Sequence, residues 1–116
     1  MINCNGNIQN NSNLAIENNR GFLFGDAIFE TIKVNGTKIL FLEEHYLRLM
    51  ASMRICRMEI PMNFTMEFME EEILKLIALQ TNKVSNRIRF SVFRNAEGFY
   101  NPTSNDVQFI ITCSEL

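Results

Sequence analysis

The sequence has 116 residues, of which 47% are hydrophobic, and a formal net charge of −2. This is the size of one domain, with enough apolar side chains to form a core without a metal or a disulfide framework. The balanced charge and the lack of an apolar run of about 20 residues exclude nucleic acid and membrane as expected partners. Three widely spaced cysteines and no signal-peptide pattern indicate a cytoplasmic protein.

The first half of the chain predicts a short strand and then a hairpin. Ile2, Cys4 and Ile8 have even spacing, so residues 1–8 are expected to form an edge strand, and the polar residues 9–19 a loop. Residues 27–34 alternate between an apolar face that includes Glu30 and a second face that carries Phe29, Thr31 and Lys33, which predicts a strand. Asn-Gly at 35–36 predicts a tight turn, and residues 38–41 the returning strand.

Two helices are predicted in the middle of the chain. Acidic residues open the segment 43–57, whose apolar residues recur at helical spacing, and Pro61 follows it. Thr65 is a predicted N-cap of the second helix. The expected apolar residues of the two helices are Tyr46, Leu47, Met50, Met53 and Ile55, then Phe68, Ile73, Leu76, Ile77 and Leu79. The expected solvated acidic residues of the second helix are Glu67, Glu70, Glu71 and Glu72.

The last part of the chain predicts two more strands. Residues 86–94 alternate, a polar loop with Gly98 and Pro102 follows, and the apolar run at 107–112 predicts a strand that is buried on both faces. The resulting order is β-β-α-α-β-β. We therefore expect an α+β domain of two layers, with a mostly antiparallel sheet and two helices.

Several charged residues are candidates for polar chemistry before any relative is considered. Arg20 and Asp26 bracket a glycine-containing turn, in which they are expected to pair. Arg48 lies on a largely apolar helix three residues from His45, the only histidine, and its planar guanidinium suits a phosphate. An ordinary surface pair with Glu44 is the alternative for Arg48.

Arg87 and Arg89 share one face of a strand whose other face is apolar. Such a pair could bind a carboxylate ligand, or it could simply belong to an exposed face of the sheet. The residues alone leave both interpretations open. The sequence contains no arrangement of a nucleophile beside a base and no metal-ligand spacing.

Three blocks in register resemble the class IV aminotransferases, which are fold type IV pyridoxal-phosphate enzymes. The first block reads RGFLFGDAIFET at residues 20–31, the second FLEEHYLRLMAS at 41–52, and the third RIR at 87–89 followed by RNAEG at 94–98. The resemblance runs from about residue 20 to the end of the chain. It is closest to branched-chain aminotransferases and 4-amino-4-deoxychorismate lyases.

The resemblance implies roles for four residues. Arg48 corresponds to the arginine that holds the phosphate of the cofactor, pyridoxal 5'-phosphate. Phe29 and Thr31 lie on the strand that lines the substrate pocket, and Arg89 stands where branched-chain enzymes carry an arginine for a substrate carboxylate. Phe29 in place of tyrosine, and a 94–102 loop without histidine, depart from the D-amino-acid enzymes of the family. Ala27 and Asn95 replace common glycines.

The resemblance also implies that residues 1–116 are an N-terminal small domain, and that a C-terminal domain carries the Schiff-base lysine. None of Lys33, Lys38, Lys75 and Lys83 falls in a family motif for that lysine, so this chain is expected to be inactive alone and to contain no catalytic residue. The complete enzyme is expected to be a homodimer that transfers an amino group between an amino acid, with branched-chain substrates first, and a 2-oxo acid. The alternatives are the small domain of a 4-amino-4-deoxychorismate lyase and a non-catalytic module for binding or dimerisation.

Overall fold

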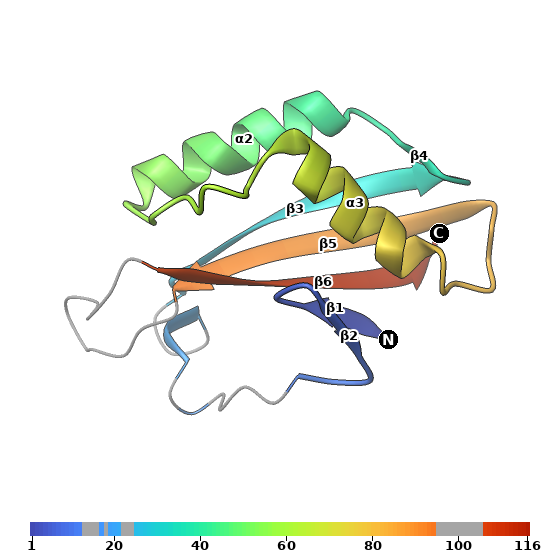
Figure 1. The fold of residues 1–116 in the computed structure, drawn as a ribbon, viewed down its shortest axis with the longest axis horizontal. Helices are drawn as coiled ribbons and strands as arrows, with labels where there is room; N and C mark the ends of the chain where they lie inside the picture. Colours follow the sequence, from blue (N-terminus) through green and yellow to red (C-terminus); the bar gives the residue numbers. More distant parts are fainter. Residues whose placement is uncertain (13–16, 18, 22–24, 95–105) are drawn as a thin grey trace.

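A computed structural model describes residues 1–12, 17, 19–21, 25–94 and 106–116. Parts of the predicted 9–19 loop, the centre of the segment 20–26, and the predicted loop with Gly98 and Pro102 lie outside these residues. Figure 1 shows a single curved sheet with both helices on the same face. The elements are β1 (Ile2–Cys4), β2 (Asn7–Gln9), β3 (Ala27–Asn35), β4 (Lys38–Ile39), α2 (Leu42–Ile55), α3 (Met66–Ile77), β5 (Ser85–Arg94) and β6 (Val107–Glu115).

The sheet has six strands in the order β2-β1-β6-β5-β3-β4. Each described pair of neighbouring strands is antiparallel. The longest pairings join β5 to β3 on one side and to β6 on the other, so β5 is the centre of the sheet. This arrangement confirms the predicted α+β architecture of two layers and adds a hairpin at the N-terminus.

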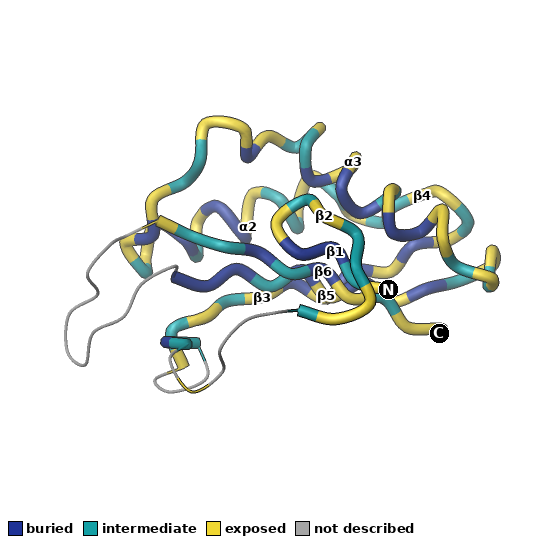
Figure 2. Tube along the Cα trace, turned by 60° about the horizontal axis from the view of Figure 1, so that its bottom comes forward, coloured by how far each residue is buried: buried dark blue, intermediate teal, exposed yellow. Residues whose placement is uncertain are grey.

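Strand β3, and strand β5 as far as Val92, alternate as their sequences predict, because successive side chains of a strand point to opposite faces. At the end of β5, Phe93 and Arg94 are both buried. In β3, Glu30, Ile32 and Val34 are buried beneath the helices, whereas Phe29, Thr31 and Lys33 are exposed on the far face. The distribution of burial along the chain is visible in Figure 2. We call the face that carries the helices the inner face and the opposite one the outer face.

Local signals explain where the hairpin turns and where the second helix begins. The turn after β3 consists of residues 36 and 37, and Gly36 has a φ of 62°, a left-handed conformation that favours glycine. Thr65 caps α3 as predicted, because its side-chain oxygen accepts a hydrogen bond from the Phe68 backbone N–H at 3.1 Å.

The core lies between the inner face of the sheet and the two helices. Phe90 is at its centre, 1% exposed, with its ring stacked on that of Phe109 at a centroid distance of 5.4 Å. The buried members of the core are Ile32, Val34, Leu49, Met50, Met53, Met58, Phe64, Met69, Ile73, Leu76, Ile77, Ile88, Phe90, Val92, Phe109 and Ile111.

Two strand predictions are wrong in detail. Residues 1–8 form no single strand but most of a hairpin, because Asn5 and Gly6 have positive φ angles of 54° and 91° and reverse the chain. The apolar run at 107–112 belongs to a strand buried mainly on one face: Phe109 and Ile111 are buried, whereas Thr112 is exposed.

Some helix predictions are also wrong. Leu47 and Ile55 are 57% and 82% exposed, and Leu79, 51% exposed, lies beyond the end of α3. In α2, Leu49 is buried in the core instead of Leu47 and Ile55. Glu72 is not solvated, since the N-terminal hairpin docks on it: Asn3 donates a hydrogen bond of 2.7 Å to its carboxylate. In the described part of the chain, no helix is long and apolar enough to cross a membrane.

Candidate functional site

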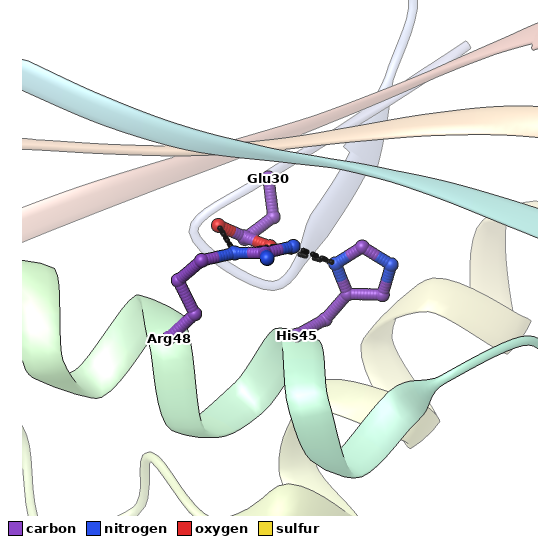
Figure 3. Close-up of polar contacts among 3 residues, drawn as sticks. All are labelled: Glu30, His45 and Arg48. Carbon is purple, nitrogen blue, oxygen red and sulfur yellow. Dashed lines mark hydrogen bonds and ion pairs between the residues drawn. The ribbon is translucent and has the colours of Figure 1, made fainter.

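Arg48 projects from α2 toward the inner face of β3, where it meets Glu30 (Figure 3). Arg48 Nε lies 3.0 Å from both carboxylate oxygens of Glu30, and Nη2 lies 2.8 Å from Oε1. The Glu30 side chain is 8% exposed and that of Arg48 is 62% exposed. A buried carboxylate therefore anchors a guanidinium that reaches solvent, and this carboxylate is not the predicted alternative partner, Glu44.

His45, one turn before Arg48, completes this cluster. Its Nδ1 lies 2.6 Å from Glu30 Oε1 and 3.2 Å from Arg48 Nη2. An ionised carboxylate accepts hydrogen bonds but cannot donate them, so Nδ1 carries the hydrogen in the first contact. The second contact then joins two donors and is not a hydrogen bond. Two side chains, with three nitrogen donors, thus converge on Oε1 of Glu30, which holds His45 and Arg48 close together.

The balance of burial and charge keeps Glu30 ionised. Burial acts to raise the pKa of this carboxyl, but hydrogen bonds from Arg48 and His45, together with their charges, outweigh burial and lower the pKa below its ordinary value of 4.5. The same hydrogen bond and the charge of Glu30 raise the pKa of the Arg48 guanidinium. The pair is therefore charged on both sides at neutral pH.

Acid should weaken the fold partly through Glu30. A carboxyl whose pKa is lower in the folded state contributes stability above its unfolded pKa, and that contribution is lost as the pH falls through the folded value. We therefore expect the wild-type chain to lose more stability than Glu30→Gln as the pH falls below about 4.5. Urea unfolding at several pH values tests this, and equal pH dependence in the two proteins would contradict it.

Phe29, Thr31 and Arg89 lie together on the outer face. The guanidinium carbon of Arg89 lies 3.9 Å from the centre of the Phe29 ring, a cation–π contact that holds the side chain along the sheet. Thr31 is the cross-strand partner of Arg89 in the pairing of β3 with β5. The three residues predicted to contact substrate thus form one exposed group.

The outer face carries further positive charge beside this group. Lys33 and Arg87 are exposed and stand directly opposite each other across β3 and β5. Like charges in this position are unfavourable. On the other side of β5, Arg87 faces Ser114 and Arg89 faces Thr112, so neither arginine has an acidic cross-strand neighbour. This surface is therefore suited to an anion.

The structure does not bring Arg48 onto the same face as the other three predicted residues. Glu30, which holds Arg48, points to the inner face, whereas its neighbours Phe29 and Thr31 point to the outer face. Among the described residues, β4 pairs only with Val34 and Asn35 of β3. The rest of that edge of β3 has no neighbouring strand in the described part.

A second charged cluster joins the ends of three elements and has a structural role. Asp26 accepts hydrogen bonds from Arg20 Nε at 2.8 Å and from Arg94 Nη1 at 2.5 Å. Arg94 also donates to the backbone carbonyl of Cys56, just after α2. The predicted pair of Arg20 and Asp26 is confirmed, and Arg94 is an additional partner that the sequence did not reveal.

The described lysines and acids add little to these clusters. Lys75 contacts Glu72 at 2.9 Å, and Lys83 donates to the Ala78 carbonyl. Lys33 lies on the outer face and Lys38 in β4. Among the described residues, no three His, Cys, Asp or Glu side chains gather as ligands for a metal ion. The main residue that sequence reasoning missed is Glu30, whose only signal was an acid on the apolar face of a strand.

Residues 27–116 match the sequence model of the family described as amino-transferase class IV. A comparison with curated protein sequences gave no match.

Solved structures with a similar fold include three branched-chain aminotransferases. The enzyme from Escherichia coli has a TM-score of 0.84 and 20% identity over 99% of this chain and 39% of its own. The T.th. enzyme, solved with pyridoxamine 5'-phosphate, has a TM-score of 0.81 and 27% identity over 99% and 40%. The enzyme from Thermoproteus uzoniensis, solved with norvaline, has a TM-score of 0.82 and 15% identity over 98% and 40%. The chain thus spans about two fifths of the length of these structures.

Proposed function

The chain belongs to the class IV aminotransferase family, and on this premise we propose that it is the small domain of a pyridoxal-phosphate-dependent aminotransferase. The reaction transfers an amino group between an amino acid and a 2-oxo acid, with branched-chain amino acids as the first substrate class. The similarity to branched-chain aminotransferases at 27% identity supports this choice. A further domain, for which the greater length of those chains leaves room, supplies the lysine, and the complete protein is a cytoplasmic homodimer.

Arg48 is the residue proposed to bind the cofactor phosphate. Its side chain is 62% exposed, and among the contacts of the described residues none engages Nη1. A charged, solvent-facing donor of this kind fits a phosphate oxygen. When bound, the cofactor supplies an electron-withdrawing ring that stabilises negative charge at the α-carbon of the substrate. The contribution of this chain is to hold and orient, which is why it needs no nucleophile of its own.

The outer face is proposed to bind the substrate. Arg89, held against Phe29, offers a guanidinium to a carboxylate, and the neighbouring cations Lys33 and Arg87 raise the local positive potential. The exposed ring of Phe29 offers an apolar surface for an aliphatic side chain. The stacked pair of Arg89 on Phe29 is the observation that best supports an amino-acid substrate, because such a substrate has both a carboxylate and, in the branched-chain class, an apolar group.

Replacing Arg48 with glutamine in the full-length protein should weaken the binding of pyridoxal 5'-phosphate roughly tenfold to a hundredfold, because a hydrogen bond to a charged group is lost. Titration of the apoprotein with the cofactor, followed by absorbance, measures the dissociation constant. Arg54→Gln is a matched control, since Arg54 is an exposed arginine in the last turn of the same helix. Equal affinities in the two variants would refute the phosphate role.

Replacing Arg89 with glutamine should lower kcat/KM for amino-acid substrates by roughly tenfold to a hundredfold, for loss of the carboxylate contact. The stability of the fold should change little, because Arg89 is exposed. A coupled transaminase assay on the full-length protein measures the first effect and urea unfolding the second. Lys38→Gln, an exposed cation in β4, should leave kcat/KM unchanged. An Arg89 variant with wild-type kcat/KM would rule out the carboxylate role.

A further inference from the structure

The carboxylate of Glu30 occupies one whole edge of the Arg48 guanidinium. Both Nε and Nη2 donate to it, at distances of 2.8–3.0 Å. A guanidinium recognises an anion most strongly by offering two parallel N–H groups along one edge. Because Glu30 already uses the edge formed by Nε and Nη2, the edge that remains for an external anion is formed by Nη1 and the second N–H of Nη2. Arg48 therefore meets a ligand through this outer edge, whose direction is set by the carboxylate.

The anchor of this arrangement is rigid, although Arg48 itself is exposed. Glu30 lies in the middle of β3, whose nine residues all pair with β5, and its side chain is 8% exposed. His45 holds Oε1 from the other side at 2.6 Å. An unrestrained arginine on a helix surface loses rotamer freedom when it binds a ligand. The pair with Glu30 removes much of that freedom before any ligand arrives.

We propose that Glu30, assisted by His45, is a positioning residue that orients Arg48 toward the phosphate of the cofactor. This inference rests on the proposed function, since it gives Glu30 a role through Arg48. Positioning and simple charge repulsion predict opposite effects of Glu30 on the affinity for phosphate. Glu30 is an anion close to the site of another anion, so removal of its charge would strengthen phosphate binding if charge alone decided the affinity. Positioning predicts that removal of the carboxylate weakens phosphate binding.

The test compares pyridoxal 5'-phosphate with pyridoxal, which lacks the phosphate, as ligands of the full-length apoprotein. In Glu30→Gln, the affinity for pyridoxal 5'-phosphate should fall about tenfold, the lower end of what loss of an orienting partner costs at metal sites. The affinity for pyridoxal should stay within about twofold of the wild-type value. In the double variant with Arg48→Gln, the loss should be no greater than in Arg48→Gln alone, because Glu30 acts through Arg48.

Glu72→Gln is the matched control for the loss of a buried carboxylate. Glu72 lies on α3 and is 7% exposed, like Glu30, but its partners are Asn3 and Lys75. Glu72→Gln should leave the preference for the phosphorylated ligand unchanged. Should Glu30→Gln fail to fold, Glu30→Asp keeps the charge and shortens the side chain by one methylene. In that variant, the affinity for pyridoxal 5'-phosphate relative to pyridoxal should fall about threefold. This is a smaller loss than the one expected when the orienting partner is removed completely.

The outcomes separate the two proposals. Unchanged or tighter binding of pyridoxal 5'-phosphate in the Glu30 variants, or an equal loss for both ligands, would overturn the positioning role and leave Glu30 as a structural ion pair. An unchanged preference in Arg48→Gln itself would overturn the proposed phosphate role of Arg48. A phosphate-specific loss in both Arg48→Gln and the Glu30 variants, with no loss in Glu72→Gln, supports the inference.

Discussion

Replacement of Phe90 with alanine should lower the free energy of unfolding of this chain by about 3–5 kcal/mol, the usual cost of removing a buried aromatic side chain. Phe90 is 1% exposed on the inner face of β5, and its ring stacks on that of Phe109. Its removal leaves a cavity between the sheet and the helices, and the paired strands on both sides of β5 limit how far that cavity can collapse. Urea unfolding, followed by circular dichroism, measures the effect.

Phe29→Ala is the matched control for this prediction. Phe29 is the same residue type in the neighbouring strand β3, but it is 51% exposed on the outer face. It should cost no more than about 1 kcal/mol, mainly through its contact with Arg89. Equal destabilisation by the two substitutions would contradict the assignment of inner and outer faces.

Replacement of Asp26 with alanine should also destabilise the fold strongly, by about 3–5 kcal/mol, the cost of breaking a buried ion pair by removing one partner. Asp26 accepts hydrogen bonds from Arg20 and Arg94, each of which is 7% exposed. Without this carboxylate, two poorly hydrated cations lie close together. Because Arg94 also binds the carbonyl of Cys56, the damage should extend to the end of α2.

Lys75→Ala is the comparison for Asp26→Ala, again by urea unfolding. Lys75 forms an ion pair with Glu72, but its side chain is 43% exposed, and pairs of this kind contribute at most about 1 kcal/mol. If Asp26→Ala destabilises the chain no more than Lys75→Ala does, then the cluster of Arg20, Asp26 and Arg94 is not needed to join the three elements.

Features that depend on neighbours in the sequence were predictable. The alternation in β3 and β5 follows from a period of two residues, and it correctly separated Glu30 from Phe29 and Thr31. The cap at Thr65 and the turn at Gly36 follow from the conformational preferences of single residues. Such signals need no knowledge of how distant segments pack.

Features that depend on distant contacts were not predictable. Leu47 and Ile55 fit a helical stripe by composition, but the position of α2 on the sheet leaves both exposed. Glu72 is buried by the N-terminal hairpin, which lies about 70 residues earlier in the chain and docks through Asn3. Periodicity places an apolar residue on a face, but the partner element decides which part of that face is covered.

The same limit applies to the candidate site. The sequence marks Arg48 as a candidate, but its partner Glu30 lies 18 residues away in a strand. The pattern of β3 showed an acid on the buried face, a position that is costly for a charge unless it is paired. That acid indicated a partner from another element, and the fold supplies it as His45 and the largely exposed Arg48 of α2.

The placement of Phe29 and Glu30 on opposite faces constrains how this domain can diverge in length. The two residues are consecutive, so an insertion or deletion of one residue in β3 before them would turn Phe29 inward and Glu30 outward. Both the group on the outer face and the anchor of Arg48 would be lost at once. Insertions or deletions within this strand are therefore tolerated only if they involve two residues or form a bulge. The turn that follows β3 can change in length by one residue without exchanging the faces.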